Sequence, residues 1–265
     1  LYLPIDRLMA YYGENRDGVH LPSNFHLIPL TWQARTIAGL IEAYEAALPP
    51  GAWPNWVLGN HDRSRVASRL GAAKARLAAM LLLTLRGTPT LYYGDEIGMV
   101  DGAIPPELVQ DPWEKNVPGV GLGRDPERTP MQWSAEPGGG FTAGRPWLPV
   151  APDAALVNVA RARREPTSML SLYRCLLALR RERPALTAGG YDAVDARGEV
   201  LAYVRRAGAD RCLVTLNLGS SSERLPVPAD FRGGRVLVST GMNREGARVG
   251  DVLDLDGDEG VVVAP

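Results

Sequence analysis

The chain has 265 residues, of which 45% are hydrophobic and 22% are charged; its 29 basic and 30 acidic side chains give a net charge of −1. This composition excludes a globally disordered chain, because so much apolar surface can offset the entropy lost on folding. The balanced charge gives no support for binding nucleic acid or an anionic membrane surface, since both require a basic footprint.

Helices and short apolar strands alternate along the first part of the chain. Residues 4–12 have helical spacing, and residues 25–30 form an apolar run that predicts a strand. Thr31 is the predicted N-cap of the next helix, which ends at Pro49 and Pro50.

Two further strands are predicted over 56–59 and 90–93, with a long helix over 64–85 between them. Continuous apolar strands alternating with helices are typical of a parallel sheet covered by helices. Such sheets bind ligands at the carboxyl ends of their strands. The polar segments Asn60-His61-Asp62 and Asp95-Glu96 follow two of the predicted strands.

The hydrophobic pattern changes in the second part of the chain. Residues 97–150 form a long segment rich in Gly, Pro and Trp, and loops of this length are usually functional. A helix is predicted over 168–183. After residue 189 the apolar period becomes two, which predicts strands and a final hairpin over 253–263 around Asp256-Gly257. The predicted strands are 200–204, 212–216 and 236–238.

Neither a metal site nor a cofactor site is predicted. Two isolated cysteines, Cys175 and Cys212, make neither a zinc site nor a disulfide framework, and their apolar surroundings predict that both are buried. No apolar run approaches the roughly 18 residues of a membrane span, so no membrane partner is predicted.

Four segments carry a distinctive pattern of polar and aromatic residues. They are WPNWVLGNHDR at 53–63, GTPTLYYGDEIGM at 87–99, DPWE at 111–114 and GRDPERTPMQW at 123–133. In this order they resemble glycoside hydrolase family 13, the α-amylase superfamily, and most closely its α-glucosidase and oligo-1,6-glucosidase branch. The resemblance covers residues 1 to about 150, and the following β region is similar to the family's C-terminal domain.

The resemblance implies an α/β fold, with part of a TIM (β/α)8 barrel followed by a small antiparallel β-sandwich. The three predicted strands become barrel strands six to eight, so residues 1–188 form the C-terminal portion of the barrel and 189–265 the sandwich. The family's nucleophilic Asp and acid/base Glu lie on strands four and five, and that Glu would immediately precede Leu1. We therefore expect a fragment that is inactive alone and whose partner is the missing N-terminal half of the barrel.

The resemblance also supplies a candidate site. Asp62 matches the third carboxylate, which stabilises the oxocarbenium-like transition state, and His61 matches the hydroxyl-binding residue beside it. Arg128 matches the arginine that reaches the glucosyl unit of the substrate. Arg63 and Arg65 follow Asp62 and are expected to keep it ionised. From the residues alone, Asp62 could instead cap a helix, and Arg128 could belong to a surface ion-pair cluster.

Other residues of the motifs are weaker candidates. Arg124 and Asp125 lie beside Arg128 in sequence. Asp95 and Glu96 would point opposite ways in an extended chain, so they are expected to hold the loop after strand eight and not to act as a catalytic pair. Three tryptophans could stack on sugar rings, although loop packing explains each of them: Trp113, Trp133 and Trp147.

We therefore expect a retaining α-glucosidase-type hydrolase whose substrate is maltose or a short α-linked gluco-oligosaccharide. Two alternatives stay open: a glucosyl-transferring relative, such as a trehalulose or trehalose synthase, and a non-catalytic truncated homologue that binds a sugar or a partner. The segment 53–62 favours the hydrolase. The sequence leaves open the linkage preference, the compartment and the oligomeric state.

Overall fold

The computed structural model describes residues 2–265, so Leu1, the first residue of the predicted barrel portion 1–188, lies outside the described residues. The chain divides into two compact units. The first comprises the residues up to Leu58 together with Arg76–Thr90 and Arg174–Pro265, and the second comprises Gly59–Ala75 and Leu91–Tyr173.

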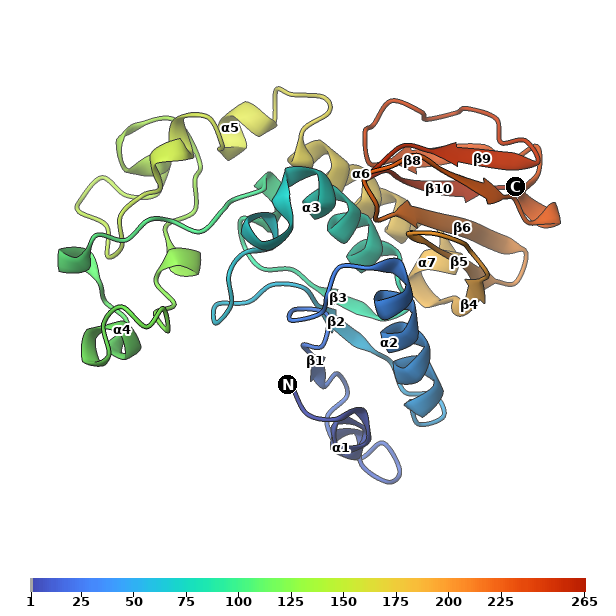
Figure 1. The fold of residues 1–265 in the computed structure, drawn as a ribbon, viewed down its shortest axis with the longest axis horizontal. Helices are drawn as coiled ribbons and strands as arrows, with labels where there is room; N and C mark the ends of the chain where they lie inside the picture. Colours follow the sequence, from blue (N-terminus) through green and yellow to red (C-terminus); the bar gives the residue numbers. More distant parts are fainter. Residues whose placement is uncertain (1) are drawn as a thin grey trace. The chain divides into compact units, whose positions relative to one another are not determined.

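A three-stranded parallel sheet in the first unit has the order β1-β2-β3 (Figure 1). Its strands are β1 (Ser23–Asn24), β2 (Asn55–Val57) and β3 (Thr88–Thr90), and Trp56 of β2 pairs with Asn24 and with Pro89. Parallel neighbours need crossover connections, and these contain helices α2 (Ala34–Ala47) and α3 (Val66–Thr84). The predicted β/α units of a partial barrel are confirmed.

The strand predicted over 25–30 is wrong. The chain leaves the sheet after Asn24, because the Asn24 side-chain oxygen accepts the His26 N–H at 3.0 Å and forms a second bond, of 2.7 Å, with His26 Nδ1. Such a side-chain bond to the backbone two residues later favours a turn. The Ile28 N–H then bonds to the Phe25 carbonyl at 3.0 Å. The strand predicted over 90–93 is likewise displaced, since β3 ends at Thr90.

The N-cap predicted at Thr31 is also wrong. Helix α2 begins at Ala34, whose N–H donates to a carboxylate oxygen of Glu199 at 3.0 Å. Glu199 precedes a strand far along the chain, so local sequence gives no sign of this cap. A carboxylate at a helix N-terminus satisfies a free N–H and interacts favourably with the helix dipole.

The remaining helices are short apart from α6. Residues 97–150, predicted as a long loop, contain one five-residue helix and several 3-10 turns. Cys212 is buried as predicted, whereas Cys175 is exposed on α6, which corrects the expectation for that residue. The helices are α1 (Ile5–Met9), α4 (Pro112–Asn116), α5 (Val159–Ala162), α6 (Met169–Glu182) and α7 (Pro184–Ala188). The 3-10 turns are Ala10–Tyr12, Asp95–Ile97, Pro106–Leu108, Pro126–Arg128, Pro137–Gly140, Pro152–Ala155 and Ala229–Phe231.

Antiparallel strands make up the rest of the first unit in two sheets. The larger sheet has the order β4-β5-β6-β10-β8, and the smaller one pairs β7 with β9. The strands are β4 (Gly190–Val194), β5 (Val200–Ala207), β6 (Asp210–Asn217), β7 (Glu223–Pro226), β8 (Arg235–Ser239), β9 (Val252–Leu255) and β10 (Gly260–Ala264).

The predicted hairpin over 253–263 is wrong, because β9 and β10 belong to different sheets. Residues 256–259 carry the chain from one sheet to the other. The Asn217 side chain donates to the Asp256 carbonyl at 2.8 Å, and the Glu259 carboxylate accepts the Asp256 N–H at 2.9 Å. These side-chain bonds hold a corner where a hairpin would require pairing of the two strands.

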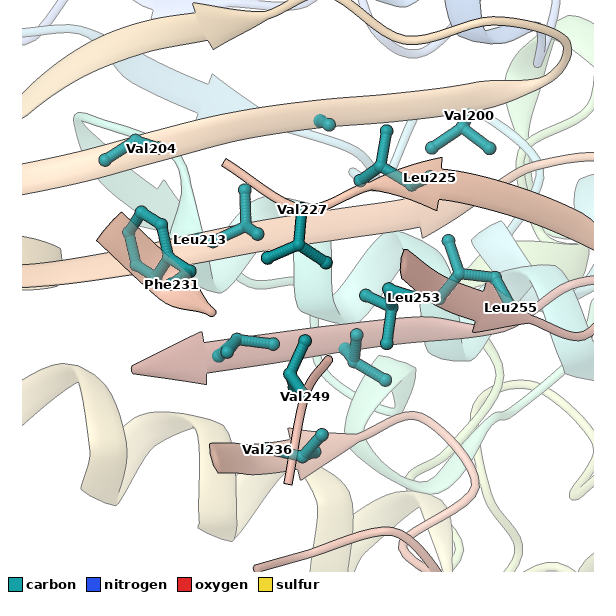
Figure 2. Packing of buried hydrophobic residues seen from close by; sticks show 13 residues of the cluster. Val200, Val204, Leu213, Leu225, Val227, Phe231, Val236, Val249, Leu253 and Leu255 are labelled. Atoms are coloured by element: carbon teal, nitrogen blue, oxygen red, sulfur yellow. The ribbon is translucent and has the colours of Figure 1, made fainter. Parts of the chain in front are cut away.

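Valine, leucine and phenylalanine side chains fill the space between the two sheets (Figure 2). Val200 and Val204 of β5 belong to this core together with Leu253 and Leu255 of β9. The opposite face of β5 is buried as well, since the Arg205 guanidinium donates to the Thr84 carbonyl in α3. The predicted sandwich is confirmed, while its boundary at residues 188 and 189 stays a prediction. Among residues 2–265, no helix combines the length and apolar character needed to cross a membrane.

The Glu199 contact can be tested by mutation. Glu199→Ala should lower the free energy of unfolding by about 1 kcal/mol, because the first turn of α2 loses its cap. Thr31→Ala is the control and should change it by less than about 0.5 kcal/mol, because Thr31 is exposed. Urea unfolding followed by circular dichroism measures both, and equal losses would contradict the assignment of the cap.

Candidate active site

A tight turn follows β2 and contains Asn60, His61 and Asp62. The Asp62 N–H donates to the Asn60 side-chain oxygen at 3.0 Å, and Asn60 bridges to Arg63. His61 Nε2 lies 3.5 Å from Asp62 Oδ1, and the two side chains are 64% and 45% exposed. The turn therefore presents an imidazole and a carboxylate side by side to solvent.

Two guanidinium groups meet at one oxygen of Asp62. Arg124 Nη1 and Arg128 Nη2 lie 3.1 and 3.0 Å from Asp62 Oδ1, and Arg128 Nε donates to the His61 carbonyl at 2.8 Å. Within residues 2–265, no group bonds to Asp62 Oδ2. The structure thus brings together Asp62, His61 and Arg128, the three residues predicted from the sequence, and leaves one carboxylate oxygen open.

The helix-cap alternative for Asp62 finds no support in these contacts. Near the start of α3, the Arg65 N–H donates to the Asp101 carboxylate at 2.7 Å, and the Ser64 hydroxyl donates to the same carboxylate. Asp101 therefore takes the place at the helix start that the sequence could have given to Asp62.

Arg124 is more central than the sequence suggested, because a buried carboxylate holds it in place. Its Nε and Nη2 donate to the two oxygens of Asp111 at 2.7 and 3.2 Å, and its backbone N–H donates to Asp111 Oδ2 at 2.8 Å. Asp111 is 2% exposed. The bonds from Arg124 hold the pKa of Asp111 well below its ordinary value, and Asp111 in turn raises the pKa of Arg124.

Sequence reasoning missed Asp111 altogether, although it begins one of the recognised motifs. Asp125 also proves to be a positioning group: its Oδ2 accepts the N–H groups of Gln110 and Asp111 at 2.6 and 2.9 Å. Asp125 therefore fixes the backbone that carries Asp111, and Asp111 fixes the guanidinium that reaches Asp62.

The expectation that Arg65 lies beside Asp62 is wrong. Arg65 is fully buried, donates to the Tyr93 carbonyl at 2.6 Å and lies over the rings of Tyr92 and Tyr93. The arginines that contact Asp62 are instead Arg124 and Arg128, which lie 62 and 66 positions further along the chain.

Asp95 and Glu96 lie in a 3-10 turn and not in the extended chain that was expected. Glu96 accepts the Gly94 N–H at 2.7 Å, which is the loop-holding contact expected of this pair. Asp95 is buried, and burial raises its pKa to about 7, although the nearby Arg65 guanidinium acts in the opposite direction.

An open cavity of about 540 Å³ adjoins Arg128. Two of the three candidate tryptophans, Trp133 and Trp147, line it together with Glu96, whereas Trp113 does not. Over residues 2–265, no group of three or more His, Cys, Asp or Glu side chains is arranged to hold a metal ion. The residues at the site offer hydrogen bonding, charge and aromatic surface.

Comparison with known proteins decides the family. Residues 9–189 match the family described as "Alpha amylase, catalytic domain". The chain belongs to the alpha-amylase family. Its relatives include proteins named as maltases, alpha-glucosidases and an oligo-1,6-glucosidase. Maltase A1 of Drosophila melanogaster is 37% identical over 233 residues, which cover 84% of this chain and 40% of the maltase.

Two other similar proteins have names of a different kind. The amino acid transporter heavy chain SLC3A1 of Rattus norvegicus is 32% identical over 271 residues, covering 97% of this chain and 38% of that protein. The crystal structure of the trehalulose synthase MutB from Pseudomonas mesoacidophila MX-45 superposes with a TM-score of 0.86 at 26% identity, covering 98% of this chain and 53% of that one.

This alpha-amylase family chain thus spans about 40% of the maltase and about half of the trehalulose synthase. The predicted family and fold class, part of a TIM barrel followed by a β-sandwich, are confirmed.

The buried carboxyl of Asp95 predicts a pH effect. Between its ordinary pKa of 3.8 and its folded value of about 7, the folded chain keeps a proton that the unfolded chain has lost. This group therefore lowers stability progressively as the pH rises from about 4 to about 7. Asp95→Asn removes that cost, so its stability relative to the parent should rise by about 1 kcal/mol per pH unit across the window. Urea unfolding at pH 4, 5.5 and 7 measures the difference.

Asp111→Asn is the matched control with the opposite sign. The pKa of Asp111 is lowered in the folded chain, so its stabilising contribution is present at neutral pH and is lost as the pH falls below about 4. The variant should be less stable than the parent at pH 7 and should approach it in acid. A difference for Asp95→Asn that stays flat from pH 4 to 7 would show that its carboxyl titrates normally.

Proposed function

We propose that this chain is part of a retaining α-glucosidase-type glycoside hydrolase that acts on maltose or short α-linked gluco-oligosaccharides. Membership of the alpha-amylase family and similarity to proteins named as maltases and alpha-glucosidases support the class. The single observation that carries the site is the Asp62 carboxylate, one oxygen of which is held by two guanidinium groups while the other is open.

The proposed role of Asp62 is electrostatic. Glycoside hydrolysis passes through an oxocarbenium-like transition state, and a carboxylate fixed near the sugar ring stabilises the positive charge as it develops. Arg124 and Arg128 hold Asp62 Oδ1 before substrate arrives, so the carboxylate needs little reorganisation during the reaction. Asp62 Oδ2 is then free to accept a sugar hydroxyl.

Arg128 and His61 are proposed to bind the glucosyl unit. Arg128 uses Nε and Nη2 within the protein, which leaves donors of its guanidinium for substrate hydroxyls. The His61 imidazole is 64% exposed beside the Asp62 carboxylate, so both can contact one sugar. Trp133 and Trp147, which line the adjoining cavity, offer aromatic surface to the same ligand.

Retention also needs a nucleophile and an acid/base group. By the family resemblance these two carboxylates belong to barrel strands four and five, so we assign them to an N-terminal portion of a longer enzyme. The 265-residue chain alone should then give no measurable turnover of a nitrophenyl α-glucoside, because two of three carboxylates are missing. Clear turnover by the purified chain, with the Asp62→Asn chain as its control, would contradict this assignment.

Two other functions have a specific observation behind them. Structural similarity to a trehalulose synthase favours glucosyl transfer, and products made from sucrose would distinguish it from hydrolysis. The match to a transporter heavy chain over 97% of this chain favours a homologue that binds a partner without catalysis. In that case a longer protein that contains the nucleophile and the acid/base carboxylate would still show no turnover.

The test of the proposed function is Asp62→Asn in the longer enzyme. Asparagine keeps an oxygen for Arg124 and Arg128 but removes the negative charge, so kcat should fall by about 10²-fold or more. The melting temperature should stay within a few degrees of the parent. Asp254→Asn is the control, because Asp254 is an exposed carboxylate of β9 whose arginine contact lies in the sandwich. Near-parental kcat in a folded Asp62→Asn enzyme would remove Asp62 from the reaction.

A further inference from the structure

Two adjacent tyrosines hold the backbone on either side of Arg128. The Tyr92 hydroxyl donates to the Glu127 carbonyl at 3.1 Å, and the Tyr93 hydroxyl donates to the Thr129 carbonyl at 2.6 Å. These carbonyls belong to the residues immediately before and after Arg128. The tyrosines come from the segment that follows β3, 35 and 36 residues earlier in the chain.

The two tyrosine rings are themselves fixed by Arg65. The Arg65 guanidinium carbon lies 5.1 Å from the centre of the Tyr92 ring and 4.6 Å from that of Tyr93, and the rings meet edge to face at 4.8 Å. The same guanidinium donates to the Tyr93 carbonyl. Because Arg65 is fully buried, the rings cannot shift without exposing or unstacking a cation.

Glycine at position 94 makes this close packing possible. Its φ is +88°, and a Cβ there would lie 2.5 Å from Met99 Sδ and 2.8 Å from Arg65 Nη1. Any other side chain would therefore push the segment carrying Tyr92 and Tyr93 away from Arg65.

The turn around Arg128 has further backbone bonds, which fix its first residues, whereas the tyrosines bond to its last ones. The Arg128 N–H donates to the Asp125 carbonyl at 3.0 Å, and the Gly102 N–H donates to the Pro126 carbonyl at 2.8 Å. The guanidinium end of Arg128 is bonded to Asp62 and to the His61 carbonyl. The bonds from the tyrosines hold the backbone, and those at the guanidinium leave other donors of Arg128 for a substrate.

We propose that Tyr92 and Tyr93 are positioning residues for Arg128. Their hydroxyls fix the backbone from which the Arg128 side chain extends, so that its guanidinium can contact Asp62 and a substrate hydroxyl together. This inference rests on the proposed function, because it requires that Arg128 binds the substrate. It assigns the tyrosines no direct contact with the sugar.

The first test uses tyrosine-to-phenylalanine variants of the longer enzyme, which keep the rings on Arg65 and remove only the hydroxyls. Tyr92→Phe and Tyr93→Phe should each lower kcat/KM by about 2- to 10-fold, the value of one hydrogen bond, and the double variant by more. Tyr191→Phe is the matched control, because within residues 2–265 the buried Tyr191 hydroxyl has no hydrogen-bond partner. Parental kcat/KM in the double variant would overturn the proposal.

The second test repeats the changes in an Arg128→Ala background. If the tyrosines act through Arg128, removing their hydroxyls there should change kcat/KM by less than about 2-fold. A general structural role, or a direct contact between Tyr93 and the sugar, would leave the loss undiminished in that background. Either result would overturn the positioning role.

Amide hydrogen exchange gives a readout that does not depend on activity. Protection of the amides of residues 127–129 should fall in the double phenylalanine variant and should be unchanged in Tyr191→Phe. If Arg128→Ala keeps parental kcat/KM, the proposed function of Arg128 fails, and so does the positioning role, even where exchange shows that the tyrosines hold the turn. If Arg128→Ala is impaired but the tyrosine variants keep both activity and protection, the inference about the tyrosines fails alone.

Discussion

A guanidinium removed from water organises the second unit. Arg65 is fully buried, and its guanidinium donates to the Tyr93 carbonyl and lies over two aromatic rings, whose faces take the place of a bonded carboxylate. Removing such a charge from water is costly unless its surroundings are well fixed. Asp95 and Glu127 lie within its field, and burial raises the pKa of each to about 7. The packing around Arg65 therefore has little freedom to change.

Two separate chains of contacts position Asp62. One runs from Arg65 through the tyrosine hydroxyls to the turn that carries Arg128. The other runs from the buried Asp111 carboxylate to Arg124. Each chain of contacts begins at a buried group, Arg65 or Asp111, and ends in a guanidinium on the same carboxylate oxygen, so the orientation of Asp62 depends on groups in the interior of the unit. An exposed carboxylate on a loop thereby acquires the rigidity expected of a core residue.

The sequence predicted the parts of this arrangement that depend on short motifs. Asp62, His61 and Arg128 were found because each lies in a recognisable segment, and the alternation of strands and helices was found from the short apolar runs, although β1 and β3 begin earlier than predicted. The role of Asp111 was not predicted, because its partners Arg124 and Asp125 lie in the same long loop, where no periodic pattern marks a contact. The contacts of Asp62 were not predicted either, since they join it to arginines 62 and 66 residues away. The same limit explains the cap from Glu199.

Errors in the β region had a different cause. Alternating apolar residues on both sides of Asp256-Gly257 fit a hairpin and fit a corner between two sheets equally well. The choice is made by two side chains that bond to the backbone of Asp256: Asn217, at the end of another strand, and Glu259, at the end of the corner itself. Likewise Asn24 ends β1 through a bond to His26 that overrides the apolar character of the residues after it.

The order of strands in the larger sheet has a consequence for biosynthesis. Strand β10 is the last of its sheet along the chain, yet it lies in the interior of the sheet, between β6 and β8. Until Gly260–Ala264 have left the ribosome, β6 and β8 each present an unpaired edge, and the sandwich core lacks Val261 and Val263. Nascent chains are therefore exposed to edge-to-edge association until that strand emerges. A ribosome that stalls a few codons before β10 would leave β6 and β8 unjoined.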